Sequence, residues 1–261
     1  MSKVFPSHNG RSEFESNSFA KGLRILEAFE GDTALLSMAD IARRAGQDRA
    51  TARRGILTLE AMGFLRRHGR LFSLTPKVLK LSESFLQSSR VPQDVWPILN
   101  QCATRLKADV CLATLIDTRV LLICTAVFPY SSTAMRNSAG PGFAPLSSAL
   151  GQMLLAQQPQ EISQTLMDQI AQTEPVDTIT TPELSRHIQT ARTAGFAFDD
   201  GACRFGYANL AVPVQTSTDQ ALVVGLLYKP SQPLSETIET CVDLLHDCAA
   251  DLSSLTNLSL M

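Results

Sequence analysis

The sequence lacks the features that mark exported, membrane-spanning and metal-binding proteins. None of its six cysteines forms a CxxC pair and the polar N-terminus has no apolar signal core, so reduced thiols in a cytoplasmic protein are expected. The longest apolar runs, near residues 120–127 and 221–228, fall well short of the roughly 20 residues that span a bilayer. Four scattered histidines offer no metal-ligand spacing. We therefore expect neither a metal nor a cofactor.

The signatures of common enzyme classes are missing as well. The chain contains no GxSxG, GxxxxGK[ST], HExxH or GxGxxG motif. His246, Asp247 and Cys248 are the one cluster that combines a base, an acid and a nucleophile. Because these residues are consecutive on a predicted amphipathic helix, their side chains diverge and cannot form a triad. The sequence thus predicts a protein that is not an enzyme.

Charged residues are few, at 18%, and the net charge of −2 conceals two regions of opposite sign. Residues 1–90 contain 15 Lys and Arg against 9 Asp and Glu, whereas residues 91–261 contain 8 against 16. Residues 41–70 alone contain eight arginines. A basic N-terminal region followed by an acidic remainder predicts a polyanion-binding domain joined to a domain of another kind.

The basic region has the element order of a winged helix-turn-helix. Apolar spacing and caps predict helices over residues 18–30, 37–46 and 48–62, and two short strands over 64–67 and 70–74. In this motif the third helix enters the major groove of DNA and the hairpin can reach the phosphates. The apolar positions assigned to the first helix are Phe19, Leu23, Leu26 and Phe29.

The arginines of this region fall on the elements expected to meet double-stranded DNA. The guanidinium fork matches guanine O6 and N7, and a threonine methyl group can contact thymine. Any single arginine is equally well explained as part of a solvated helix face, but their concentration favours DNA binding. The candidate DNA-binding residues are Ser37, Arg43, Arg44, Asp48, Arg49, Thr51, Arg53, Arg54, Arg66, Arg67, His68 and Arg70.

The acidic remainder alternates strand pairs with helices, which predicts an α+β domain. Strand hairpins are expected over 110–127 and 208–228, with helices near 147–157, 162 and 182–193, and a long helix over 235–255. The expected domain organisation is a disordered tail at 1–17, a DNA-binding domain at 18–75, a linker helix at 76–91 and a second domain at 92–261.

Several segments resemble the IclR family of bacterial transcriptional regulators. In the basic region these are ADIARRAG at 39–46, RATARRGILTLEAMGFL at 49–65 and LTPKVLKL at 74–81. Beyond them lie APLSSALGQMLLA at 144–156 and GFAFDDGACRFGYANLAVPV at 195–214. The segments ATARR and LTPKVL are most similar to those of the subgroup that regulates aromatic-acid catabolism.

The resemblance implies a second domain with a GAF/PAS-like antiparallel sheet that binds a small carboxylic-acid effector. It also implies a homodimer formed through the DNA-binding part, often paired into a tetramer. Effector sites of the family lie between the sheet and a Gly/Pro-rich loop. Carried over by position, the implied ligand-binding residues are Phe143, Ser148, Ala149, Leu150, Asp199, Asn209, Leu226 and Tyr228.

Leu226 and Tyr228 stand where relatives that bind small keto acids have hydroxyl side chains, so an apolar, aromatic carboxylic acid is the expected effector. Amides at a helix N-terminus near Ser148 suit a carboxylate. Phe143, Leu150 and Leu226 are equally compatible with ordinary core positions. An alternative therefore stays open, in which the second domain only oligomerises and has no small-molecule effector.

Overall fold

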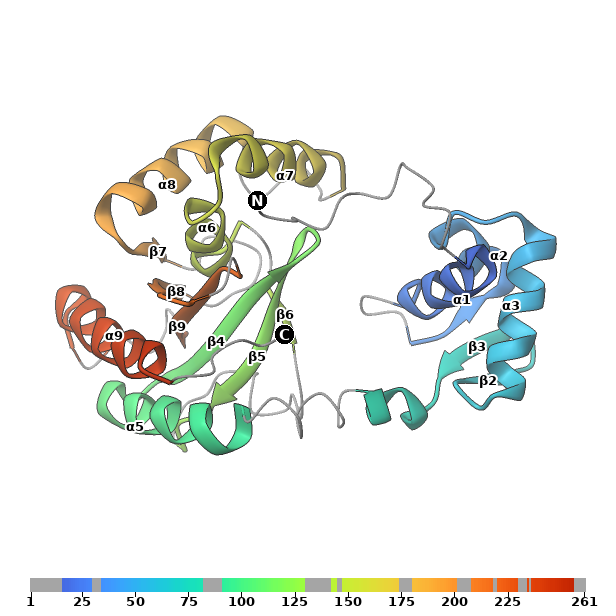
Figure 1. Cartoon of the computed structure of the whole chain (residues 1–261), viewed down its shortest axis with the longest axis horizontal. Coiled ribbons are helices and arrows are strands. Elements are labelled where there is room, and N and C mark those ends of the chain that lie inside the picture. The colour runs from blue at the N-terminus through green and yellow to red at the C-terminus, as the bar shows by residue number, and fades with distance from the viewer. Residues whose placement is uncertain are drawn as a thin grey trace. The chain divides into compact units, whose positions relative to one another are not determined.

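The computed structural model describes residues 16–29, 34–81, 91–129, 142–144, 147–173, 180–200, 208–217, 220–229, 234 and 236–255. The chain divides into two compact units, residues 1–88 and 89–261, and each is described by itself (Figure 1). Most of the expected N-terminal tail and residues 82–90 of the expected linker helix lie outside the described residues. Among the described residues, no helix combines the length and apolar character needed to cross a bilayer.

The first unit consists of three helices and a small antiparallel sheet. Its elements are α1 (Asn17–Glu27), β1 (Leu36–Ser37), α2 (Met38–Arg44), α3 (Arg49–Ala61), β2 (Leu65–His68), β3 (Leu71–Leu74) and the 3-10 turn η1 (Pro76–Val78). The strand order is β1-β3-β2. This arrangement confirms the predicted winged helix-turn-helix, with β1 as a strand that the sequence patterns did not predict.

The core of the first unit forms where the three helices meet the sheet. Ile25, Ile41, Ile56 and Phe72, one from each of α1, α2, α3 and β3, are almost completely buried. Helices α1 and α3 cross so closely that a Cβ atom at Gly55 would overlap the side chain of Ile25. A side chain at position 55 would therefore require the terminal methyl group of Ile25 to move.

The apolar pattern of α1 is only partly buried. Phe29 lies in the core and Leu26 packs against it, as the spacing predicts. Phe19 and Leu23 instead expose 69% and 42% of their surfaces. The helix thus presents two apolar side chains, one turn apart, away from its own core.

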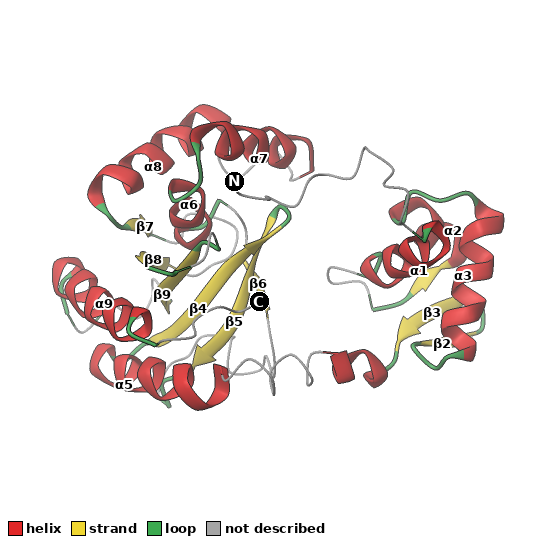
Figure 2. Cartoon of the chain, viewed as in Figure 1, coloured by secondary structure: helices red, strands yellow, loops and turns green. Residues whose placement is uncertain are grey.

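The second unit is built on one six-stranded antiparallel sheet in the order β6-β5-β4-β9-β8-β7 (Figure 2). The strands are β4 (Asp109–Ile116), β5 (Arg119–Ala126), β6 (Gly142–Ala144), β7 (Ala197–Asp199), β8 (Ala208–Val214) and β9 (Leu222–Tyr228). The predicted hairpins are present as β4–β5 and β8–β9, and they pair with each other through β4 and β9.

Helices cover both faces of this sheet (Figure 1). One face carries α5 (Trp96–Leu106), which follows a turn of π-helix at Val91–Val95, and α9 (Ile238–Ser253). The other face carries α6 (Ala149–Ala156), α7 (Gln160–Thr173) and α8 (Thr181–Ala194). Because side chains alternate along a strand, most apolar core residues of the sheet belong to one of two clusters, one on each face.

Candidate DNA-binding surface and effector site

Helix α3 begins at a cap that its own sequence supplies. The carboxylate of Asp48 accepts hydrogen bonds from the backbone amides of Ala50 and Thr51, at 3.0 and 2.9 Å. The bond from the Thr51 amide is the main reason that the pKa of Asp48 lies below its usual value. The carboxylate of Asp48 therefore stabilises the first turn of α3, to which Thr51 belongs.

The arginines of α3 lie on the side that the core leaves uncovered. Ala52, Ile56 and Leu59 are buried, whereas Arg49, Arg53 and Arg54 are exposed. Within the described parts of the chain, no salt bridge engages these three guanidinium groups. Arg49 and Arg53 are one turn apart and share a helix face. This end of α3 can present forked donors to base edges in a major groove.

Helix α2 uses its polar residues mainly within the protein. The hydroxyl of Ser37 donates to the carboxylate of Asp40 at 2.7 Å and caps the helix by accepting from the Asp40 amide. The Ser37 hydroxyl is also the main cause of the lowered pKa of Asp40. Arg43 pairs with Asp40 at 2.8 Å, and Arg44 donates to the carbonyl of Ala28. The contacts of Ser37 and Asp40 stabilise the start of α2, and the bond from Arg44 joins α2 to the end of α1.

The wing is a tight hairpin between β2 and β3. Gly69 has a φ of 64°, a conformation that glycine adopts without strain. Arg67 donates to the carbonyl of Gly69 at 2.9 Å and lies over the ring of Phe72, while His68 contacts the Ser73 hydroxyl at 3.1 Å. Both side chains are thereby oriented within the hairpin.

Arg66 and Arg70 are exposed on the same hairpin, so they extend the basic surface beyond α3. Lys77, to which no sequence motif pointed, contacts the end of α3 from the turn η1. Its ammonium group donates to the carbonyl of Met62 at 2.6 Å and lies 4.8 Å from the ring centre of Phe64. Lys77 thus connects the end of α3 to the segment that follows the wing.

In the second unit, the start of α6 is joined to the sheet. The backbone amide of Ala149 donates to the side-chain oxygen of Asn209 on β8 at 2.8 Å, and both residues are buried. Ser148 caps the helix by accepting from the Gly151 amide, and Gln152 donates to the carbonyl of Ser147 at 2.8 Å. A buried polar region therefore lies where α6 begins.

Leu150 and Asp199, two of the remaining candidate residues, lie beside this region. Leu150 is completely buried against the sheet, where a Cβ atom at Gly225 would overlap it. Asp199 is the cross-strand partner of Asn209 and is half-buried, so both side chains belong to the same face. Phe143 lies on β6, opposite Leu121 of β5, but its side chain is outside the described residues.

The structure does not bring Leu226 and Tyr228 together with the residues at the start of α6. Both pack with the cluster under α5 and α9, on the opposite face of the sheet from α6. The residues of β9 that face α6 are Val223, Gly225 and Leu227. A displacement of one residue in a strand moves a side chain to the other face, so position alone could not place these two. Burial also raises the pKa of Tyr228.

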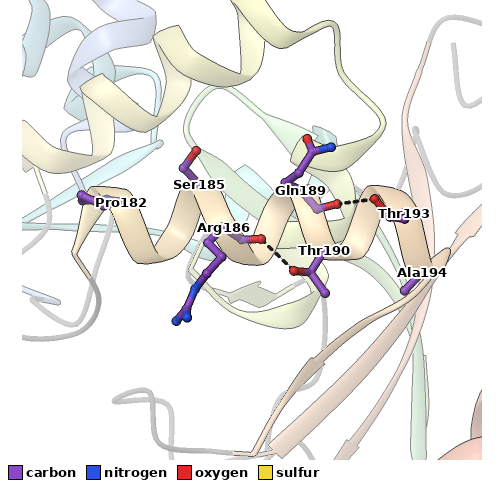
Figure 3. Close-up of a pocket in the computed structure, with 7 residues that line it drawn as sticks. All are labelled: Pro182, Ser185, Arg186, Gln189, Thr190, Thr193 and Ala194. Carbon is purple, nitrogen blue, oxygen red and sulfur yellow. Dashed lines mark hydrogen bonds between the residues drawn. The ribbon is translucent and has the colours of Figure 1, made fainter.

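An open pocket lies elsewhere, on the outward side of α8 (Figure 3). Its lining residues all come from that helix and its N-terminal turn: Pro182, Ser185, Arg186, Gln189, Thr190, Thr193 and Ala194. The hydroxyls of Thr190 and Thr193 donate to carbonyls one turn earlier, so they are used within the helix. The pocket contains none of the candidate ligand residues.

Comparison with known proteins agrees with this geometry. Residues 83–254 match the family model described as bacterial transcriptional regulator IclR C-terminal, and residues 18–69 match the IclR helix-turn-helix domain. The Pca operon regulatory protein of Acinetobacter baylyi is 26% identical over 251 residues, which cover 90% of this chain and 87% of that protein. The matches are to regulators rather than enzymes, as the sequence predicts.

Solved structures share the fold. An IclR family transcriptional regulator from Brucella abortus has a TM-score of 0.82 at 22% identity, covering 95% of this chain and 96% of that one. An IclR homologue from Microbacterium hydrocarbonoxydans, complexed with 4-hydroxybenzoate, has a TM-score of 0.67 at 22% identity over 94% and 100% of the two chains. The α+β architecture with an N-terminal helix-turn-helix is thereby confirmed. The chain belongs to the IclR family of bacterial transcriptional regulators.

Proposed function

We propose that this regulator controls an operon for aromatic-acid catabolism, binds its operator through α3 and the wing, and senses an aromatic carboxylic acid at the start of α6. The observation that carries the DNA-binding part is the exposed pair Arg49 and Arg53 on the first two turns of α3. The operon class rests on the likeness to the Pca operon regulatory protein and to the homologue complexed with 4-hydroxybenzoate.

The DNA-binding part is tested by the salt dependence of operator binding. Six to eight phosphate contacts would lower the affinity by roughly 10³-fold or more between 50 and 200 mM salt. Arg49→Ala should weaken specific binding by about 1–3 kcal/mol, because one base or phosphate contact is lost. Arg186→Ala removes an exposed arginine of the second unit and serves as the matched control. A flat salt profile, or equal losses in both variants, would contradict the proposed surface.

The effector part rests on the chemistry around Ala149. Amides at the start of a helix favour a carboxylate. In the structure the Ala149 amide donates to the side-chain oxygen of Asn209, so an oxygen acceptor already lies at this amide. The residues of β9 that face α6, Val223, Gly225 and Leu227, carry no hydroxyl group. An aromatic ring therefore fits this face better than a small keto acid.

Thermal shift with 4-hydroxybenzoate tests the effector part, with 4-hydroxybenzyl alcohol as the analogue that lacks the carboxylate. A ligand at a hundredfold excess over its Kd stabilises the folded state by about 2.7 kcal/mol. We expect stabilisation by the acid and none by the alcohol. The absence of stabilisation across a panel of aromatic acids would favour the alternative in which the second domain only oligomerises.

We further infer that the protein is a homodimer through its first unit. The exposed side chains of Phe19 and Leu23 support this inference, because they lie one turn apart on α1 and a second copy of the chain could cover both. Two copies of α3 would then read two half-sites about one helical turn apart, or a multiple of it.

A further inference from the structure

Two cysteines from distant parts of the chain meet between α5 and α9. Cys102 lies on α5 and Cys248 on α9, and both belong to the apolar cluster on that face of the sheet. Leu244, whose carbonyl the Cys102 thiol contacts, lies one helical turn before Cys248, and each thiol affects the pKa of the other. Each retains a small accessible fraction, 5% for Cys102 and 4% for Cys248. The fold therefore brings two free sulfur atoms together in a place that no part of the DNA-binding or effector proposal uses.

The surroundings of the two thiols differ in a way that suits a pair of unequal reactivity. The neighbouring Cys248 thiol, assisted by the positive charge of Arg105, lowers the pKa of Cys102. The neighbouring Cys102 thiol and burial raise the pKa of Cys248. The Cys102 thiol also donates to the carbonyl of Leu244 at 3.9 Å, which orients it along α9. Cys102 is thus the residue that more readily becomes a thiolate, the reactive form of cysteine.

Solvent lies close to the pair. Arg105 forms a salt bridge with Asp247 at 3.6 Å, and their side chains are 50% and 64% exposed. Each of these residues lies within one turn of, or next to, one of the two cysteines along its helix. A small oxidant therefore needs only a local opening at the α5–α9 contact to reach the sulfur atoms.

We propose that Cys102 and Cys248 form a site of reversible oxidation, in which a hydroperoxide converts the two thiols into a disulfide that links α5 to α9. The thiolate of Cys102 attacks one oxygen of hydrogen peroxide, the O–O bond breaks, hydroxide leaves and a sulfenic acid forms. The sulfur of Cys248 then attacks the Cys102 sulfur, the S–O bond breaks, and the released hydroxyl leaves as water with the proton of Cys248. Two thiols lose two electrons in total and one peroxide becomes two waters.

Another pair of neighbouring cysteines provides an internal contrast. Cys111 and Cys124 lie on the adjacent strands β4 and β5, but Cys111 packs on the α6 side of the sheet and Cys124 on the α5–α9 side. Side chains that point to opposite faces cannot be bridged without movement of the backbone. Burial also raises the pKa of Cys111 to about 12 and that of Cys124 to about 11. We expect this pair to remain reduced.

The test treats the reduced, full-length protein with hydrogen peroxide, blocks the remaining thiols and maps cross-links by mass spectrometry without reduction. Digestion with trypsin and chymotrypsin separates Cys241 from Cys248 at Leu244 and Leu245. The expected result is a Cys102–Cys248 link as the main product, which dithiothreitol reverses. The link should be lost in Cys102→Ser and Cys248→Ala and kept in Cys111→Ser.

A second measurement keeps the inference testable where a variant folds poorly. Oxidation should raise the melting temperature of the wild-type protein and of Cys111→Ser, because a covalent link restricts the unfolded chain. It should leave Cys248→Ala unchanged. A different pair as the main product, oxidation of Cys102 to sulfinic acid without a link, or a link that forms only in denaturant would each overturn the proposed site.

Discussion

Asn209 connects the centre of the second unit to the residue where α6 starts, and its chemistry decides what this site can accept. Its side-chain oxygen accepts from the Ala149 amide at 2.8 Å in a buried environment. An acceptor on a ligand would have to take the same donor or lie next to it. The polarity of this single side chain should therefore govern the response to a carboxylate effector.

Replacing Asn209 by Asp keeps an acceptor for the Ala149 amide but adds a negative charge. Two like charges about 4 Å apart repel by roughly 1 kcal/mol in water and about 4 kcal/mol near a protein surface, so we expect the Kd for 4-hydroxybenzoate to rise at least about tenfold. Tyr228→Phe is the control, because Tyr228 lies on the other face of the sheet. By isothermal titration, the affinity of Tyr228→Phe for 4-hydroxybenzoate should stay within about twofold of the wild-type value. The opposite ranking would show that the effector binds under α5 and α9.

Asp48 gives a prediction with a defined pH dependence. Its pKa is lowered in the folded state, so its stabilising contribution is complete above the unfolded value of about 3.9 and is lost as the pH falls through the folded value. At pH 7, Asp48→Asn should melt near the wild type, since Asn also caps helices well, and Asp48→Ala should melt lower. The difference between wild type and Asp48→Ala should narrow below pH 4 in thermal melts. A gap that is constant from pH 7 to pH 3 would argue against the charged cap.

At the scale of elements, local sequence patterns predicted the helices with clear caps and the long strands, but not the short strands. The caps at Ser37 and Asp48 and the apolar spacing predicted α2 and α3 within a residue or two, and alternation predicted the long strands of both hairpins. Strands β1, β6 and β7 contain only two or three residues, and they exist because a distant strand pairs with them. A short segment carries too little periodicity to reveal such pairing.

The region at the start of α6 contains one feature that local sequence predicts and one that depends on distant residues. The Ser148 cap is a local signal and could be predicted, whereas the bond between Ala149 and Asn209 joins residues 60 positions apart. Leu226 and Tyr228 were assigned to this site by position, and the sheet turns them to the other face. The facing of a strand follows from its pairing register, which no single segment contains.

The crossing of α1 and α3 gives a prediction for these elements as a pair. Gly55→Ala gains about 1 kcal/mol in helix propensity, but the added methyl group overlaps the buried side chain of Ile25, and overpacking costs about 1–3 kcal/mol. We expect a net loss of about 1 kcal/mol in urea unfolding. Gly22→Ala on α1 is the matched control, since its Cβ meets nothing within 4 Å, and it should stabilise by up to about 1 kcal/mol. Equal gains for both would mean that the helices are not in close contact.

At the scale of the whole molecule, the low net charge is the sum of a positive first unit and a negative second unit. The net positive charge of residues 1–90 is concentrated on the unit that contains α3 and the wing, and the net negative charge of residues 91–261 belongs to the unit that contains the sheet. A polyanion is attracted to the first and repelled by the second. DNA binding then depends on how many copies of the first unit act together.

Phe19 and Leu23 should determine whether two copies of the first unit associate. If α1 forms the dimer contact, Phe19→Ser with Leu23→Ser removes two apolar side chains that are 69% and 42% exposed in one chain, so folding is preserved while the dimer dissociates. Light scattering after size exclusion should give the monomer mass, or a halved assembly if a second interface exists. Operator affinity should fall by roughly 10²-fold or more, because half-sites no longer bind together. Met62→Ser, at a residue 53% exposed beside the end of α3, is the control and should keep the wild-type mass. An unchanged mass for the double variant would place the dimer contact elsewhere on the chain.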